Sequence, residues 1–246
     1  MRNFLTLWRR ELDGYFVSSA AYVMSVVVLA ITGLGFWGQA RLNCGEPLRL
    51  DILVFWLPTI WLMVMIVATV LTMRLFAEEK RSGTIEALMT APVTDAEVVL
   101  GKYASALTVF AVTFLPTILY PLVLRRFSSG IGPIDGGALL SGYAMFVLMG
   151  AFYASVGLFM SAVSRSQIVA AVMSFAALCG IFLLPGVLDH AIGGSGVAIL
   201  RFLSAFEHIQ DSSRGIVDTR AIVLYISCTW FMLFATTKVL ESRRWV

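Results

Sequence analysis

Long apolar runs recur along this chain, and they constrain its fold more than any other feature. A helix needs about 20 apolar residues to cross the hydrocarbon core of a bilayer. Six runs reach that length, at residues 20–39, 53–73, 103–124, 138–162, 168–188 and 221–240. None alternates polar and apolar residues as a barrel strand does, and backbone groups in lipid must bond within their own segment. The sequence therefore predicts an all-α membrane protein, with six transmembrane helices in a single domain spanning residues 1–246.

The charged residues indicate class and orientation. Only 13% of the residues are charged and 59% are apolar, whereas a soluble domain carries about 25% charged residues. Because cytoplasmic loops hold an excess of Lys and Arg, we expect both termini to be cytoplasmic. The net charge of +3 then reflects topology and attraction to anionic lipid rather than binding of nucleic acid. The residues on the predicted cytoplasmic side are Arg2, Arg9, Arg10, Arg74, Lys80, Arg81, Lys102, Arg165, Lys238, Arg243 and Arg244.

The first 18 residues have the pattern of an amphipathic helix. Arg9, Arg10 and Asp13 fall on one side at 100° per residue, and their charge makes an early start of the first span improbable. A helix of this kind lies in the headgroup plane, with Trp and Tyr at the boundary. We therefore expect an interfacial helix over residues 1–18, whose apolar face comprises Phe4, Leu5, Trp8, Leu12, Tyr15 and Phe16.

Catalytic, metal and nucleotide motifs are missing from the sequence. Gly101-Lys102 is followed by Tyr103, so it does not complete a P-loop, and Ser, His and acidic residues form no recognisable catalytic pattern. The three cysteines are far apart, and His190 and His208 are separated without a Cys between them, so we expect no metal site. No ionisable residue lies deep within a predicted span, which disfavours ion-coupled transport. We expect a protein that is not an enzyme and that relies on another chain for energy.

Residues 77–93 interrupt the apolar pattern with the charged stretch AEEKRSGTIEALMTAPV. Its charged part, with Glu78, Glu79 and Lys80, ends at Gly83, and Thr84 is placed to cap a following helix that Pro92 stops. On that short helix Ile85, Leu88 and Met89 share one face, and Glu86 lies near its positive end. A solvated loop would explain the charges but not this apolar face, because apolar residues surrounded by charge usually mark an interface. The stretch therefore predicts a coupling helix that docks on a partner.

The next helix also has a defined start. Thr94 and Glu97 have the spacing of a capping box, and Val93 and Val98 have that of a hydrophobic staple. Between the fifth and sixth runs, residues 189–220 contain a Gly-rich break and then an apolar helical pattern too short to span a membrane. We expect half-helices at the outer membrane surface there, and Asp211, Arg214, Asp218 and Arg220 form a salt-linked collar or a substrate site.

The stretch EEKRSGTIEALMTAPV resembles a motif that follows the second of six spans in the permease subunits of type-2 ATP-binding-cassette (ABC) transporters. The matching positions include Glu78, Glu79, Lys80, Gly83, Thr84, Ile85, Glu86, Leu88, Thr90 and Pro92. A second stretch, FEHIQDSSRGIVDTR, resembles the segment before the last span in the gliding-motility and copper-reductase-maturation branch. The resemblance covers essentially the whole chain.

This resemblance implies a permease that works as a homodimer or with a homologous second permease, in the bacterial inner membrane. Two cytoplasmic ABC ATPase subunits would bind ATP and Mg, and the coupling helix would seat in a cleft of the ATPase. Cargo varies widely in such families, so the fold does not name it. The implied coupling residues are Glu78, Glu79, Lys80, Gly83, Thr84, Ile85, Glu86, Leu88 and Met89. The outer half-helices would gate the exit, with Phe202, Phe206, His208, Arg214 and Asp218 as candidates.

Two alternatives stay open beside an ATP-driven exporter. One is a non-transporting scaffold in an ATP-powered envelope complex, of the gliding or metalloenzyme-maturation type. The other is a secondary carrier, which would need an ion site built from backbone carbonyls because the spans lack midplane charges.

Overall fold

The structure is a computed structural model that describes residues 2–42, 58–84, 93–120, 122–123, 136–183 and 204–242. Regular structure in these ranges is helical and includes no strand, as predicted. A 3-10 helix, η1 (Leu115–Ile118), follows α7, and a π-helix, η2 (Cys179–Leu183), follows α10. The α-helices are α1 (Arg2–Val17), α2 (Ser19–Leu42), α4 (Pro58–Thr72), α5 (Ala77–Ser82), α7 (Asp95–Phe114), α9 (Gly136–Val163), α10 (Gln167–Leu178), α13 (Ala205–Ser213) and α14 (Thr219–Ser242).

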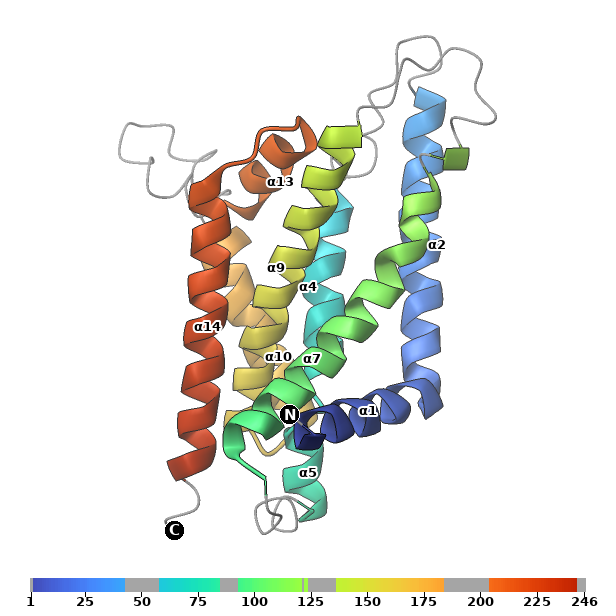
Figure 1. The fold of residues 1–246 in the computed structure, drawn as a ribbon. Helices are drawn as coiled ribbons and strands as arrows, with labels where there is room; N and C mark the ends of the chain where they lie inside the picture. Colours follow the sequence, from blue (N-terminus) through green and yellow to red (C-terminus); the bar gives the residue numbers. More distant parts are fainter. Residues whose placement is uncertain are drawn as a thin grey trace.

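The long helices form a bundle with α9 in its middle, where it packs against α14, α4, α10 and α7 (Figure 1). α2 stands at one edge and α14 at the other, while α7 crosses the bundle obliquely. α1 lies across one end of the bundle, the end that also holds α5 and the last turn of α14. We call this the terminal end. α13 lies at the opposite end.

Among the described residues, four helices are long and apolar enough to cross a membrane, and each overlaps one of the six predicted spans. The other two predicted spans, 53–73 and 168–188, contain α4 and the shorter apolar helix α10 with η2. Parts of both runs lie outside the described residues, so the six-span layout stays a prediction. The four membrane-length segments are Ala21–Gly38, Asp95–Ile118, Gly136–Val163 and Thr219–Ser242.

Glycines bring the neighbours of α9 close to its backbone. A Cβ atom placed on Gly157 would collide with the side chain of Thr72 on α4, and one on Gly150 would collide with the ring of Phe110 on α7. Helices in a bilayer are held together mainly by such close packing, because lipid tails are as apolar as the side chains. The small residues of this part of α9, from Gly150 to Gly157, are all buried.

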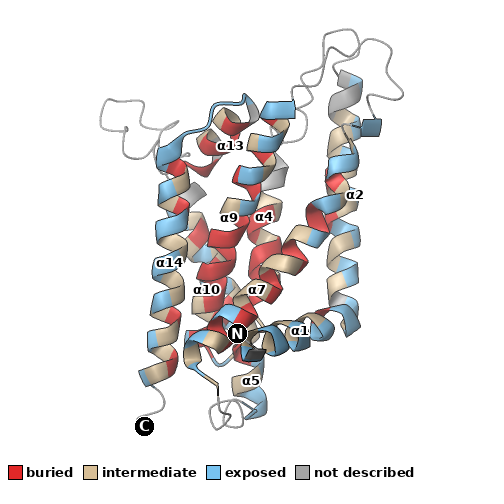
Figure 2. Cartoon of the chain, in the orientation of Figure 1, coloured by how far each residue is buried: buried red, intermediate tan, exposed pale blue. Residues whose placement is uncertain are grey.

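Burial is uneven across the bundle, as Figure 2 shows. In α9, 72% of the membrane-length segment is buried inside the protein, whereas in α2 and in α14 the buried share is only 11%. Large apolar side chains on these two outer helices are therefore exposed, among them Val26 on α2 and Trp230 on α14. In a membrane such faces contact lipid tails or another helix.

The start of α7 confirms the predicted capping box. The hydroxyl of Thr94 accepts a hydrogen bond from the backbone N–H of Glu97 at 3.3 Å, and the Glu97 carboxylate accepts one from the N–H of Thr94 at 3.2 Å. Val98 is buried in the core and Val93 packs against it, as the staple requires. At the other end of α7, Pro116 lacks a backbone donor, and the chain tightens there into η1.

α1 occupies nearly the range predicted for the interfacial helix, but its inward face is rotated from the predicted apolar face. Tyr15 is buried and Leu7 packs against the core, whereas Leu5 and Phe16 are about half exposed. The rotation has a cause in Glu11, which lies one turn before Tyr15 on the same face and bonds inside the protein. The polar groups of Glu11 and Tyr15, and not the apolar residues alone, therefore set the orientation of α1.

Candidate functional site

The terminal end of the bundle contains the described part of the predicted coupling segment, which begins at the turn from α4 into α5. Ser161 on α9 organises this turn with one hydroxyl group. Its oxygen accepts hydrogen bonds from the backbone N–H groups of Phe76 at 3.0 Å and Ala77 at 3.1 Å, and it lies 3.0 Å from the carbonyl of Met73, to which it donates. Phe76 and Ala77 are fully buried, so these N–H groups have no access to water. The turn is therefore fixed to the end of α9.

A second contact holds α5 against the same end of α9. The ammonium group of Lys80 donates a hydrogen bond to the backbone carbonyl of Ala162. Carbonyls at a helix C-terminus lack partners within the helix and carry partial negative charge, so they favour a cation at this place. Lys80 was predicted as a coupling residue, and in the structure its side chain contacts the end of α9.

Lys102 on α7 lies between two carboxylates that come from two other helices. Its Nζ atom is 2.9 Å from Glu11 Oε1 on α1 and 2.7 Å from Glu79 Oε1 on α5. The Lys102 side chain is only 3% exposed, and the two carboxylates are 19% and 17% exposed. We call these three residues the ionic joint. A buried charge is tolerated only when paired, so the joint fixes α1, α5 and α7 relative to one another.

The charge balance of the ionic joint is uneven, because one ammonium group faces two carboxylates. Burial raises the pKa of Glu79 above the usual range of a glutamate, and this effect outweighs the ion pair with Lys102, which lowers that pKa. Glu11 raises it further by repulsion. Among the described residues, the second carboxylate oxygen of Glu79 has no hydrogen-bond partner. Glu79 therefore takes up a proton more readily than an ordinary glutamate.

The close approach of α1 to α7 depends on the residue beside Lys102. A Cβ atom on Gly101 would lie 3.1 Å from Cβ of Leu7, so a larger residue would push α1 away. The indole N–H of Trp8 also donates to the hydroxyl of Thr108, about two turns after Gly101 on α7, at 3.2 Å. These contacts bring α1 near enough for Glu11 to reach Lys102.

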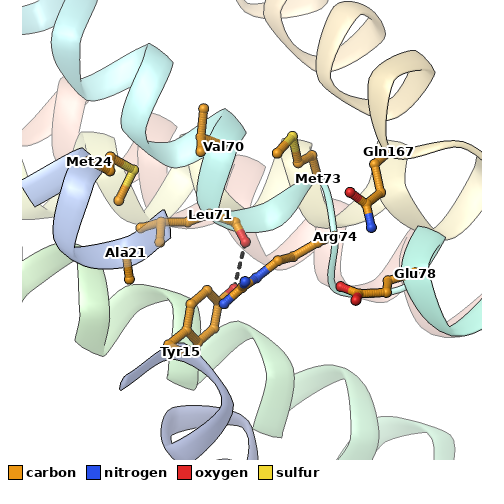
Figure 3. Close-up of a pocket in the computed structure, with 9 residues that line it drawn as sticks. All are labelled: Tyr15, Ala21, Met24, Val70, Leu71, Met73, Arg74, Glu78 and Gln167. Atoms are coloured by element: carbon orange, nitrogen blue, oxygen red, sulfur yellow. Dashed lines mark hydrogen bonds between the residues drawn. The ribbon is translucent and has the colours of Figure 1, made fainter. Parts of the chain in front are cut away.

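The end of α1 is tied to α4 by Tyr15 and Arg74 (Figure 3). The Tyr15 hydroxyl donates a hydrogen bond to the carbonyl of Leu71 at 2.5 Å. The Arg74 guanidinium lies over the Tyr15 ring, 4.3 Å from its centroid, and donates to the hydroxyl of Ser18 at 3.1 Å. Burial raises the pKa of Tyr15, so its hydroxyl keeps the proton that it donates. The link between α1 and α2 is thereby joined to the start of the α4–α5 turn.

α5 ends at Gly83, where the backbone adopts the left-handed conformation with a φ of 73°. No part of the chain that the structure describes lies within 4 Å of a Cβ placed there, so glycine is favoured by its conformation. The Thr84 hydroxyl bonds back to this end, 2.8 Å from the Ser82 hydroxyl and 3.5 Å from the Glu79 carbonyl. The segment 77–93, in which a coupling helix was predicted after Gly83, thus also contains a short helix before Gly83 that was not predicted.

The other predicted coupling residues fall in different places. Glu78 is exposed on α5, and its carboxylate lines a cavity beside Arg74. Ile85, Glu86, Leu88 and Met89 lie outside the described residues, so their shared apolar face stays a prediction, as does the role of Thr84 as a cap for them.

The predicted gate residues lie toward the opposite end of the bundle. Phe202 and the side chain of Phe206 are outside what the structure describes. Arg214 and Asp218 are exposed, and Asp218 accepts a hydrogen bond from the N–H of Arg220 at 2.8 Å at the start of α14. His208 is buried, and its Nδ1 atom lies 3.1 Å from the Tyr225 hydroxyl on α14. These residues do not gather in one described cluster.

Sequence reasoning did not anticipate the ionic joint. Lys102 was counted among the residues that set topology, and Glu11 was given no role. Glu79 and Lys102 are 23 residues apart and Glu11 and Lys102 are 91 apart, so no local spacing reveals their contact. The available signal was that a lysine at the first turns of an apolar helix needs a buried partner of opposite charge.

Comparison with known proteins gives the family. The family model described as ABC-2 family transporter protein matches residues 12–241, from the second half of α1 almost to the end of α14. No curated protein matches the sequence. The match concerns the ABC-2 family as a whole and does not support the narrower gliding-motility or copper-reductase-maturation branch. The chain, with its long apolar helices, is a multi-pass membrane protein that belongs to the ABC-2 transporter family.

Proposed function

We propose that this chain is the permease subunit of an ATP-driven ABC exporter and that the segment after Gly83 docks on a separate ATPase subunit. The observation that carries the proposal is the anchoring of α5, which reaches α7 through the Glu79–Lys102 ion pair and α9 through Lys80 and Ser161. Membership of the ABC-2 family supports the partnership with ABC ATPases.

The anchoring suits α5 for transmitting force. A push on the segment after Gly83 would meet α5, and α5 cannot shift without separating buried charges or leaving buried N–H groups without an acceptor. Movement of α5 would therefore carry α1, α7 and α9 with it. Because α9 packs against α14, α4 and α10, displacement of its end would reach most of the bundle.

The proposal includes partners that supply what this chain lacks. ATP and Mg would be bound by the ATPase subunits, and this chain would do no chemistry of its own. A second permease, identical or homologous, would cover part of the exposed apolar faces of α2 and α14. The terminal end would face the cytoplasm of a bacterium, with the permease in its inner membrane. At the opposite end, α13 and its buried His208 would shape the exit for cargo.

The proposal is tested with two substitutions in the coupling segment. Gly83→Pro forbids the left-handed conformation, and Glu86→Lys reverses a charge expected to face the ATPase. In the complex of this chain with its ATPase, either change should uncouple ATP hydrolysis from transport without removing the chain from the membrane. Arg165→Gln, an exposed cation in the link between α9 and α10, is the matched control. Normal hydrolysis and normal transport in both variants would contradict the proposal.

Reconstitution separates the exporter from the two alternatives. Proteoliposomes that hold the complete complex should move cargo only with ATP. If no solute or lipid crosses although ATP is hydrolysed, the chain is a scaffold in an ATP-powered complex. If transport runs on an ion gradient without any ATPase, the chain is a secondary carrier.

A further inference from the structure

A cavity of about 220 Å³ opens at the terminal end between α1, α2, α4 and α5, and the ionic joint does not account for it. One side of the cavity is apolar and includes Ala21 and Met24 on α2 and Val70 on α4. The other side is polar. Figure 3 shows the carboxylate of Glu78 and the amide of Gln167 on the side away from Met24 and Ala21. The guanidinium of Arg74 lies between the two sides, over the ring of Tyr15. The cavity is therefore amphipathic, with a cation and an anion among its polar groups.

The two charges do not neutralise each other by direct contact. No ion pair joins Arg74 and Glu78 within the described residues, and Arg74 instead lies over Tyr15 and bonds Ser18. A guanidinium has several N–H donors, so donors remain for a phosphate, which Arg binds with well-matched geometry. The Glu78 carboxylate is exposed, and it is suited to accept hydrogen bonds from an ammonium group.

We propose that this cavity binds the headgroup of a phosphoethanolamine lipid, with the phosphate on Arg74 and the ammonium group on Glu78. The inference does not depend on the proposed coupling to an ATPase. The space is smaller than the roughly 300–1,000 Å³ of a pocket for a drug-sized ligand, so it suits a headgroup rather than a whole lipid. The acyl chains would leave along the apolar wall toward the exposed face of α2, where Val23 and Val26 are more than half exposed.

The charges and the aromatic ring of the cavity favour a phosphoethanolamine headgroup over those of other common phospholipids. An anionic headgroup without an ammonium group would place negative charge near Glu78 with nothing to offset it. A choline headgroup cannot donate hydrogen bonds to a carboxylate, and proteins bind it with aromatic faces. The aromatic ring that lines the cavity is Tyr15, and Arg74 already covers one face of it, 4.3 Å from its centroid. The position of α1 across the bundle end also puts the cavity near the depth of lipid headgroups.

The test is native mass spectrometry of the purified full chain with equal concentrations of palmitoyl-oleoyl phosphatidylethanolamine, phosphatidylglycerol or phosphatidylcholine. We expect one phosphatidylethanolamine to be retained about fivefold or more over the other two lipids, because each charged contact of the headgroup is charge-assisted. Glu78→Gln should remove this preference over phosphatidylglycerol. Arg74→Gln should weaken both phosphatidylethanolamine and phosphatidylglycerol about tenfold. Arg165→Gln, outside the cavity, should leave the preference unchanged.

Three results would overturn the proposal. The wild-type chain could retain the three lipids equally, or Glu78→Gln could keep the full preference for phosphatidylethanolamine. Water-soluble glycerophosphoethanolamine could compete as well as the lipid itself, which would make the site one for a soluble zwitterion. Because Arg74 also contacts Tyr15 and Ser18, its variant is judged only after thermal unfolding shows a folded protein. Glu78 is exposed, so Glu78→Gln should leave the fold intact and tests the site without this complication.

Discussion

The ammonium group of Lys102 lies 2.7 Å from the carboxylate of Glu79 and thereby joins the first turns of α7 to α5. With Glu11 on its other side, Lys102 holds three helices at the end of the bundle where the proposed coupling segment begins.

Removal of the central charge should be costly. Lys102→Met leaves two largely buried carboxylates facing each other, and the expected loss is about 3–5 kcal/mol of unfolding free energy. Thermal unfolding of the detergent-purified chain measures it. The control is Lys238→Met, which breaks the exposed pair with Glu241 and should cost less than about 1 kcal/mol. Equal losses in the two variants would show that the joint does not hold the helices together.

The stability of the chain should depend on pH through Glu79. Burial raises the pKa of Glu79, so the folded chain binds more protons than the unfolded chain in a window that starts near the usual glutamate value of about 4.3. Stability from this group is then highest below the window and falls as pH rises through it. Glu79→Gln removes this dependence. The melting temperature of the variant relative to that of the wild type should increase as pH rises across the window. If the two melting temperatures change in parallel with pH, Glu79 has no such effect.

The α4–α9 contact should tolerate no side chain at Gly157. Gly157→Ala drives a methyl group into Thr72 and should cost about 1–3 kcal/mol. Thr72→Ala in the same chain should recover part of the loss, because it removes the hydroxyl that the new methyl group meets. Gly38→Ala on α2, where a Cβ would meet nothing within 4 Å, should not destabilise. A Gly157→Ala variant as stable as Gly38→Ala would contradict the close contact.

Ser161 should matter more than a neighbouring buried serine. Ser161→Ala leaves the N–H groups of Phe76 and Ala77 without their acceptor, which should cost about 1–3 kcal/mol. Ser155→Ala on the same helix is the matched control, since Ser155 is equally buried but donates only to the Phe152 carbonyl of its own helix. Urea or thermal unfolding of both variants makes the comparison, and equal effects would remove the special role of Ser161.

The helical class and several helix positions could be predicted because they follow from local sequence. Apolar runs of membrane length predicted the positions of the long helices, and the spacing of Thr94 and Glu97 predicted the start of α7. The fourth and fifth apolar runs end and begin at residues 162 and 168, and α9 likewise ends at Val163 and α10 begins at Gln167. Each of these features depends on residues near one another in the chain.

The contacts of the candidate site could not be predicted in the same way. Glu11, Glu79 and Lys102 belong to segments far apart in sequence, and a charged residue near an apolar run fits both a topology signal and a buried pair. The rotation of α1 was also missed, because amphipathic spacing gave no weight to Glu11 as an inward residue. The motif that resembles ABC permeases includes the residues of α5, but it predicted neither this short helix nor its contacts with α7 and α9.

Crosslinking from the coupling segment tests the central claim most directly. A photoreactive residue in place of Leu88 is activated in native membranes, with the same residue at exposed Ile216, near the other end of the bundle, as the control. The account predicts that the adduct from position 88 contains a P-loop ATPase and that the adduct from position 216 does not. Adducts from position 88 that never contain an ATPase, in a chain shown to be folded in the membrane, would contradict it.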